Sequence, residues 1–425
     1  MKAVPVAAAA AQWGLAGVAL QRLARGKQRR PPLAAPGPAA PLPQISVVVP
    51  ARDEELRIAG VLAPLVGAPG VAEVIVVDDR SSDATADVAR AHGARVVEGA
   101  ELPFGWIGKT WALQQGLVAA RGEVVVFLDA DVQPDPSLPA AVTVLMQESG
   151  ADLVSAQLRF ICPDPAQRIL HPALLATLIY RLGPLDTVAR VPAALAAING
   201  QCFAARREPL QRAGGFGVIS AIPTDDVALA RALTAAGWRV VVADGSALGS
   251  VRMYESAAEA MREWAGRSLA LPGASSRPRQ LLDLGVVWAV QGLPGLRLWW
   301  VLLRLLATRS PRRALASLRG LDWGLLAVRW SLQLALTKVY RLPGDPLPQD
   351  SAAGQDGGTV EDGRTPRGAD DGPTSRRVDH GRDPQRTDGG PDPLALLAPL
   401  VDPIAAAALT RGTLRPVRSW RGRTF

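Results

Sequence analysis

The chain has 425 residues, of which 48% are hydrophobic, and it carries a formal net charge of +8 at pH 7. Positive charge alone would suit nucleic acid, but only 5% of the residues are aromatic and the arginine clusters flank apolar segments, so we predict a membrane partner and no nucleic acid. The length leaves room for one catalytic domain of about 200–250 residues with further segments around it.

The N-terminal segment predicts a membrane anchor. Residues 3–20 form an apolar run about as long as a bilayer-spanning helix requires. Only Lys2 precedes this run, whereas a basic cluster follows it at residues 22–30, which is the reverse of a secretory signal. The positive-inside rule therefore predicts a signal anchor at residues 1–21, a basic, Pro/Ala-rich linker at 22–44 and a cytoplasmic location for the domain that follows.

From Ile45 onward, short apolar runs alternate with helical patterns. Such alternation is typical of βαβ units, so we expect an α/β catalytic domain at residues 45–272 with a mainly parallel, Rossmann-like sheet. The predicted strands are 45–51, 71–79, 94–99 and 123–131, and the predicted helices between them are 54–66, 82–93 and 108–120.

The run EVVVFLDAD at residues 123–131 carries the strongest chemical signal. Its continuous apolar part is typical of a strand buried on both faces, and ligands of such sheets bind beyond the carboxyl ends of the strands. In extended chain, Asp129 and Asp131 have their Cβ atoms on one side, where two carboxylates suit Mg²⁺ or Mn²⁺ shared with a diphosphate. A DxD sequence also occurs at strand ends without any function, so the neighbouring motifs decide.

Two other strand ends carry acidic motifs. PARDEE, at residues 50–55, fits either a turn whose acidic residues favour a helix N-terminus or a pocket for the nucleotide base. VDDRSSDAT follows the next strand, and Ser81 or Ser82 can cap the helix after it. Capping does not require Asp78 and Asp79, and a carboxylate at this position would accept the imide N–H of uracil.

LPFGWIGKTWAL places Gly105, Gly108 and Lys109 at the start of a predicted helix. Backbone N–H groups and a lysine at such a point form an anion site. The spacing GxxGKT differs from the GxxxxGK[ST] of a Walker A motif, so this segment does not indicate ATP hydrolysis.

TDDVALARAL opens a later helix with Asp225 and Asp226, after the flexible turn Gly214-Gly215-Phe216. Capping by Thr224 or Asp225 is one explanation of this acidic pair. A carboxylate that removes the proton of an acceptor hydroxyl is the other.

The cysteines and histidines show no metal-site spacing. Cys162 and Cys202 form no CxxC motif, which indicates ordinary buried thiols in a reducing compartment. We interpret His92 and His171 as surface or packing residues and His380 as part of a linker.

In this order, PARDEE, VDDRSSDAT, GKT, DAD, GGF and TDD resemble the family 2 glycosyltransferases of the GT-A fold over roughly residues 45–271. The resemblance implies an inverting hexosyltransferase in which Asp129 and Asp131 hold the metal and the sugar diphosphate. It also implies that Asp226, in the pair Asp225-Asp226, is the catalytic base. The chain departs from the family at Arg80, where glycine is common, and at Asp225, where glutamate is usual. The nucleotide-sugar site implied by the resemblance comprises Pro50, Arg52, Asp53, Glu54, Asp78, Asp79, Lys109 and Asp129.

LPFGWIGKTWAL, the RMY at residues 252–254, the apolar C-terminal helices and the closing WRGRTF resemble a membrane-bound branch with hopanoid-associated and carotenoid-acid (diaponeurosporenoate-type) glycosyltransferases. That resemblance implies a lipid or isoprenoid acceptor, with Gly215, Arg252 and Trp264 on the acceptor or diphosphate side. The QxxRW of processive polysaccharide synthases is absent, because Arg262 and Trp264 give only RxW.

Membrane-associated helices are predicted at residues 281–340. The apolar runs 284–303 and 321–337 contain Arg297 and Arg329, so each is either a transmembrane or an interfacial helix. Residues 341–392 are rich in Gly, Asp, Arg and Pro and predict disorder, and residues 393–425 predict an apolar helix with an Arg-rich tail.

The predicted location is the cell membrane, with several crossings and a cytoplasmic catalytic domain. If the Arg-rich tail is also cytoplasmic, an even number of crossings must follow the catalytic domain. Three apolar stretches are available, and Asp402 and Pro403 mark the last as the one that does not cross.

Together these features predict metal-dependent transfer of a sugar from a nucleoside diphosphate sugar to a lipid or isoprenoid, with Mg²⁺ or Mn²⁺ as cofactor. Two alternatives stay open. One is a polyprenyl-phosphate sugar synthase, which has the same donor site and a phosphate acceptor. The other is a catalytically silent membrane scaffold, and the intact set of carboxylates argues against it.

Overall fold

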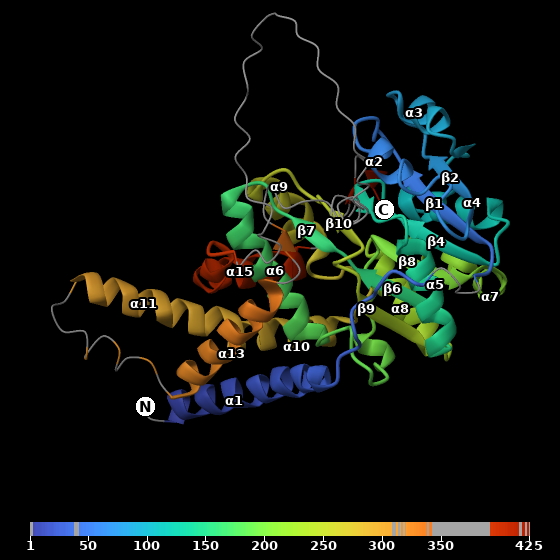
Figure 1. Cartoon of the computed structure of the whole chain (residues 1–425). Coiled ribbons are helices and arrows are strands. Elements are labelled where there is room, and N and C mark those ends of the chain that lie inside the picture. Colours follow the sequence, from blue (N-terminus) through green and yellow to red (C-terminus); the bar gives the residue numbers. More distant parts are fainter. Residues whose placement is uncertain are drawn as a thin grey trace, which may run out of the picture.

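The fold combines an α/β part with a group of long apolar helices that lie to one side of it (Figure 1). The computed structural model describes residues 3–37, 42–307, 312, 315, 318, 320–337, 340–341, 392–415, 419–420 and 423–424. Apart from its two end residues, the segment 341–392 that the sequence predicts to be disordered lies outside the described residues.

The main sheet has seven strands in the order β3-β2-β1-β4-β8-β6-β9. Neighbouring strands are parallel except for β8, which is antiparallel to both β4 and β6. The predicted α/β class is therefore confirmed, with one antiparallel strand in a mainly parallel sheet. The strands are β1 Ile45–Ala51, β2 Val71–Asp78, β3 Arg95–Glu98, β4 Val124–Leu128, β6 Leu153–Gln157, β8 Cys202–Arg206 and β9 Val240–Asp244.

The sheet separates two hydrophobic cores. Successive residues of β1 alternate between them, since Val47 and Val49 face one core and Val48 faces the other, and all three are fully buried. Burial on both faces explains the continuous valine runs of the central strands. Helices α2 Ile58–Leu62, α3 Thr85–Ala91 and α5 Leu138–Ser149 cover one face, and α4 Gly108–Ala119, α7 Arg207–Arg212 and α8 Asp225–Ala235 cover the other.

The helix predicted at residues 54–66 is shorter than expected. Only Ile58–Leu62 forms an α-helix, because the backbone N–H groups before it have other partners. The N–H of Glu54 donates to Thr85 Oγ1 at 2.8 Å and that of Glu55 donates to Asp83 Oδ2 at 3.1 Å. These bonds tie the loop after β1 to the loop after β2, so the two strand ends form one unit.

A small second sheet lies beside the carboxyl edge of the main sheet. Its order is β11-β7-β10-β5, with β5 Val132–Pro134, β7 Arg159–Ile161, β10 Gly249–Val251 and β11 Tyr340–Arg341. Strand β5 directly follows the DAD motif. Strand β11 follows helix α13, so this sheet connects the apolar helices to the α/β part of the chain.

The apolar helices pack on one another and on α6 (Figure 1). Ala16 and Ala19 of α1, Ala176 of α6 and Val286 of α10 belong to one buried cluster. The π-helical turns 288–292 continue α10 into α11. The helices of this part are α1 Ala3–Ala24, α6 Pro165–Leu182, α9 Ala257–Ala260, a π-helix Met261–Ser268, α10 Arg277–Val287, α11 Leu293–Ala307, α13 Gly320–Leu336, a 3₁₀ helix Ala395–Val401 and α15 Asp402–Leu414.

Within the described residues, two helices are long and apolar enough to cross a membrane, Arg277–Ala307 and Ala395–Leu414. About half of each lies inside the fold, 50% and 44% respectively, and buried core helices of soluble proteins meet the same criterion. The stretch that we expected not to cross is thus one of the two. Helix α13, which we expected to be a candidate membrane span, is 17 residues long and is too short to meet this criterion.

Two of the charges that interrupt the apolar stretches, Arg329 and Asp402, form a buried ion pair. Arg329 Nε lies 2.8 Å from Asp402 Oδ2, and Arg329 Nη1 donates to Gln333 Oε1 at 2.9 Å. Gln291 Nε2 donates to Asp402 Oδ1 at 2.9 Å. Arg329 and Asp402, which lie 73 residues apart in the sequence, therefore each have a partner in another helix, and Arg297 pairs with Asp322.

We expect Asp402→Ala to lower the free energy of unfolding by about 3–5 kcal/mol, because it leaves the Arg329 charge buried without its partner. Arg411→Ala, on the exposed side of the same helix, should change it by less than about 0.5 kcal/mol. Denaturant unfolding of the full chain in detergent measures both. Equal midpoints for the two variants would contradict this role of the pair.

Candidate active site

A cavity of about 850 Å³ opens at the carboxyl edge of the main sheet. Strands β1, β2 and β4 are parallel, so their carboxyl ends meet at this edge, where ligands of such sheets bind. Ten of the predicted site residues line it: Pro50, Arg52, Glu54, Asp79, Lys109, Asp129, Asp131, Asp225, Asp226 and Trp264.

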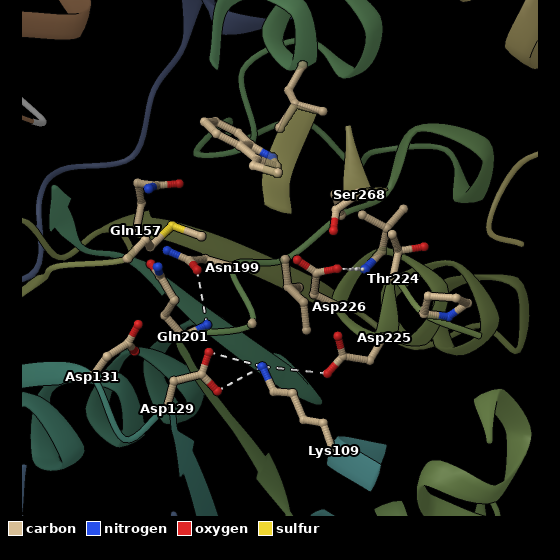
Figure 2. A pocket seen from close by; sticks show the side chains of 18 of the residues that line it. Lys109, Asp129, Asp131, Gln157, Asn199, Gln201, Thr224, Asp225, Asp226 and Ser268 are labelled. Carbon is tan, nitrogen blue, oxygen red and sulfur yellow. Dashed lines mark hydrogen bonds and ion pairs between the residues drawn. The ribbon is translucent and has the colours of Figure 1, made fainter. Parts of the chain in front are cut away.

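Lys109 connects the two acidic motifs. Its ammonium nitrogen lies 2.8 Å from Asp129 Oδ1 and 3.8 Å from Asp225 Oδ2, and Figure 2 shows it between these carboxylates. Burial alone would lower the pKa of Lys109, but Asp129 and Asp225 raise it above its usual value. The lysine is therefore a fixed positive charge at the start of α4, in the centre of the site.

Asp131 has a carboxylate oxygen that the described protein leaves unsatisfied. Its Oδ1 is buried and has no hydrogen-bond partner among the described residues. Burial, together with the nearby charge of Asp129, raises the pKa of Asp131 to about 7. Strand β4 ends at Leu128, so both aspartates lie in the turn after the strand and not in extended chain as expected.

These features fit a divalent cation. A buried carboxylate oxygen without a donor, beside a second carboxylate, is the arrangement that a hard cation completes. The described part of the chain has no group of three or more His, Cys, Asp and Glu side chains that would hold a metal alone. Mg²⁺ is usually bound by one or two carboxylates with phosphate and water as the other ligands, so two suffice when a diphosphate is present.

Asp225 and Asp226 form the first turn of α8. The Val227 N–H donates to Asp226 Oδ1 at 2.7 Å. Burial, and next the charge of Asp225, raise the pKa of Asp226 to about 7. Capping by Thr224 does not explain the pair, because in the described structure its side chain makes no cap and its hydroxyl donates to the Pro272 carbonyl at 3.1 Å.

Asp53 and Asp78 lie outside the cavity as far as the described residues define it. Asp53 Oδ1 accepts from the Ser82 N–H at 2.7 Å, and Asp78 Oδ1 accepts from the Ser81 N–H at 3.2 Å. Both therefore hold the loops after β1 and β2 in place. Arg80 has a φ of 59°, the left-handed conformation that glycine adopts without strain, so the loop keeps this shape despite the side chain.

Gly215 and Arg252 also lie outside the described lining of the cavity. Gly215 is buried with a φ of 56°, and a Cβ there would meet Gln114, so its role is to permit a tight turn. Arg252 is exposed and pairs with Glu255 at 3.5 Å. Of the three residues expected on the acceptor side, only Trp264 lines the cavity.

Three amides that no sequence motif marked line the cavity with the carboxylates: Gln157, Asn199 and Gln201 (Figure 2). Asn199 and Gln201 directly precede β8. Because β8 runs antiparallel to β4, its start lies at the carboxyl end of β4, and the Asp129 N–H donates to the Gln201 carbonyl at 3.1 Å. The polar NGQ before an apolar strand was the available signal.

The cysteines and histidines of the described chain agree with the sequence analysis. Cys162 and Cys202 are buried free thiols. His171 is buried against Phe160, with ring centroids 4.6 Å apart, and burial lowers its pKa to about 3, so it is a neutral packing residue. His380 lies outside the described residues.

Sequence comparison finds relatives in staphylococci. A 4,4'-diaponeurosporenoate glycosyltransferase from Staphylococcus haemolyticus is 28% identical over 250 residues, which span 58% of this chain and 66% of that protein. A Staphylococcus aureus protein of the same name is 40% identical over 89 residues, which span 21% of this chain and 24% of that protein. Both matches cover less than two thirds of the relative.

Two solved structures illustrate the structural comparison. Glucosyl-3-phosphoglycerate synthase from Mycobacterium tuberculosis, in complex with Mn²⁺, UDP and glucosyl-3-phosphoglycerate, is 28% identical with a TM-score of 0.36, covering 50% of this chain and 73% of that one. The mannosyltransferase PcManGT from Pyrobaculum calidifontis, in complex with GDP-Man and Mn²⁺, is 21% identical with a TM-score of 0.47, covering 78% and 92%.

The sequence profile of glycosyl transferase family 2 matches residues 46–214. The matched region begins in β1 and includes Asp79, Lys109, Asp129 and Asp131. It ends before the acidic pair of α8. Residues 46–214 are thus similar to glycosyl transferase family 2, and the staphylococcal relatives, which are named glycosyltransferases, agree with this match.

Proposed function

We propose that this enzyme transfers a sugar from a nucleoside diphosphate sugar to a hydroxyl or carboxyl group of a lipid or isoprenoid acceptor, with inversion at the anomeric carbon. The observation that carries the proposal is the meeting of two acidic pairs, Asp129/Asp131 and Asp225/Asp226, in one cavity with Lys109 between them. One pair suits the departing diphosphate, and the other suits the incoming acceptor.

The donor binds at the ends of β1, β2 and β4. Asp79 is buried, its Oδ2 lies 3.7 Å from Arg52 Nη1, and its carboxylate would accept a hydrogen bond from the base. Asp129 and Asp131 would hold Mg²⁺ or Mn²⁺, which would supply Lewis-acid neutralisation of the diphosphate. Lys109 donates to the diphosphate oxygens, because its ammonium group lies beside Asp129 at the N-terminus of α4.

The acceptor oxygen attacks the anomeric carbon from the side opposite the diphosphate. A bond forms from the acceptor oxygen to that carbon while the bond from the carbon to the diphosphate oxygen breaks, and Asp226 takes the proton of an acceptor hydroxyl. A pKa of about 7 keeps a large share of Asp226 ready to accept a proton near neutral pH. A carboxylic acid acceptor is already ionised, so Asp226 then contributes much less.

The acceptor and membrane assignments rest on the relatives and on the surface of the apolar helices. The staphylococcal relatives carry the name of a diaponeurosporenoate glycosyltransferase, which supports an isoprenoid acid. On α11, Trp300 is 53% exposed and Leu306 is 87% exposed, and large exposed apolar surfaces mark membrane contacts. We therefore place the enzyme on the cytoplasmic membrane face, attached by these helices.

A donor screen tests the proposal. The full chain in detergent, with Mg²⁺ or Mn²⁺, is incubated with each common nucleotide sugar, and release of nucleoside diphosphate is followed with and without an isoprenoid acid. We expect metal-dependent release from one donor and a new glycoside in the presence of the acceptor. No release from any donor, even after total membrane lipid is added, would refute the transferase proposal.

We expect Lys109→Met to weaken nucleotide-sugar binding by about 10–100-fold, the effect of losing a hydrogen bond between charged groups. The variant also leaves Asp129 and Asp225 facing each other without the cation between them. Lys27→Met, which removes an exposed lysine, is the matched control and should bind the donor normally. Calorimetric titration of the nucleotide sugar into each protein measures both constants. Equal affinities would exclude Lys109 from the donor site.

A further inference from the structure

The cavity continues from the carboxylates into a second, apolar half between α6 and α13. On α6, the lining residues are Leu175, Leu178, Ile179 and Leu182, with the spacing i, i+3, i+4 and i+7 that places side chains on one face of a helix. On α13, the lining residues are Leu332, Ala335 and Leu336, which have the same spacing. In the described lining, these two helices contribute no charged side chain.

Two apolar helix faces normally pack directly on each other. Here the cavity lies between parts of the apolar faces of α6 and α13. Leu178 and Ile179 are only partly buried, although each belongs to a helix whose other faces are covered by protein. An apolar space of this kind is unfavourable for water and favourable for a hydrocarbon. The complete cavity, at about 850 Å³, lies near the upper end of the roughly 300–1,000 Å³ that is typical of ligand pockets, and this apolar half is part of it.

The two halves meet at the acidic pair of α8. Ser268, at the end of the π-helix, and Leu271 line the cavity together with Asp226 and Thr224 (Figure 2). Trp264 lines the apolar half from the same π-helix and is held by His171, with ring centroids 4.6 Å apart. A ligand that fills the apolar half therefore has its end at the proposed catalytic base.

Helix α13 separates the apolar half from an exposed apolar surface. Leu332 and Leu336 face the cavity, whereas Leu334 on the opposite side is 52% exposed and Trp323, three turns earlier on that side, is 49% exposed. On α11, which contacts α13, Trp299 and Leu303 are 44% and 53% exposed. A hydrocarbon chain held in a lipid phase would meet α13 first.

We infer that the apolar space between α6 and α13 binds the hydrocarbon chain of the acceptor, an extended isoprenoid or polyene whose terminal carboxyl or hydroxyl group reaches Asp226. The inference rests on the proposed function for the reaction, and it adds the binding site and its walls. Leu178 and Leu182 form one wall, and Leu332 and Leu336 form the other. The other half of the cavity is lined by charged side chains that suit the nucleotide sugar, so it would not bind a hydrocarbon chain.

The test uses the full chain in lipid nanodiscs and cis-parinaric acid, a fluorescent polyene carboxylic acid, as the probe. We expect the probe to bind the unmodified protein and to bind Leu332→Trp about tenfold or more weakly, because the indole fills the apolar space. Leu334→Trp adds the same indole two residues away on the exposed side of α13 and should bind the probe normally. Nucleoside diphosphate release without acceptor should be equal in all three proteins.

The outcomes separate the inference from the proposed function. Equal probe binding by Leu332→Trp and Leu334→Trp, with donor turnover intact, would overturn the acceptor site and leave the transferase proposal standing. Absence of donor turnover with a selective loss of probe binding in Leu332→Trp would support the site and refute the reaction. If Leu332→Trp lowers the unfolding temperature, Leu178→Gln on the opposite wall decides, since it adds no bulk and should also weaken probe binding.

Discussion

The Asp131→Asn variant is expected to lose about a thousandfold in metal-dependent donor turnover, because a bound cation supplies several kcal/mol of charge neutralisation and every 1.36 kcal/mol is about tenfold in rate. Asn keeps the size of the side chain but removes its negative charge. In the described structure, the Oδ1 atom of Asp131 has no hydrogen-bond donor. Asp87→Asn, which changes an exposed carboxylate of α3, is the control and should keep full activity.

Thermal unfolding gives a second, activity-independent measurement for Asp131. A carboxyl group whose folded-state pKa is raised from 3.8 to about 7 destabilises the fold progressively as the pH rises through that interval, since the folded state then binds more protons than the unfolded state. Without metal at pH 8, Asp131→Asn should therefore unfold at a higher temperature than the unmodified protein. Addition of Mn²⁺ with nucleoside diphosphate should raise the unfolding temperature of the unmodified protein and not that of Asp131→Asn. A variant that retains this stabilisation would show that the cation does not need Asp131.

The Asp226→Asn variant is expected to lose about 10²–10⁴-fold in transfer to an alcohol acceptor, the range that general acid–base catalysis supplies. In the unmodified enzyme, kcat/KM should fall as the pH drops below about 7, because the protonated carboxyl cannot accept a proton. The variant should show no such decline. With a carboxylic acid acceptor the loss should be far smaller, since that acceptor has no proton to give up.

Donor binding separates this role from a structural one. Asp226→Asn should bind the nucleotide sugar with unchanged affinity, because it leaves Lys109 and its ion pair with Asp129 in place. Full turnover of an alcohol acceptor by Asp226→Asn would assign the proton transfer to another group.

The sequence indicated the central strands and the edge at which the site forms, for clear physical reasons. The valine runs of β1 and β4 are buried on both faces, a pattern that is typical of a mainly parallel sheet covered on both sides. Parallel strands align their carboxyl ends, so the meeting of Asp79 with Asp129 at one edge followed from the alternation of strands and helices. The individual side-chain roles did not follow. Asp53 and Asp79 look alike in the sequence, yet one bonds the Ser82 backbone and the other faces the cavity.

Long-range pairing was beyond the reach of sequence patterns. Nothing local shows that β8 inserts antiparallel beside β4 and thereby brings Gln201 next to Asp129. In the same way, Arg329 and Asp402 each argued against a buried or spanning helix when they were considered alone. Their ion pair depends on the packing of α13 against the C-terminal helices, which is a property of the folded chain.

The pairing of Arg329 with Asp402 also sets the order in which the chain can finish folding during its synthesis. Every residue of the carboxylate site precedes residue 227, so the α/β part can form while the ribosome is still adding the later helices. The alanine-rich face of α15, with Ala405 and Leu409, packs on Leu170 and Trp264 and arrives last. Until it does, Arg329 has no counter-charge and the wall of the apolar cavity lacks its support. On the proposed function, the residues of the donor site would therefore be synthesised before the helix that supports the proposed acceptor site.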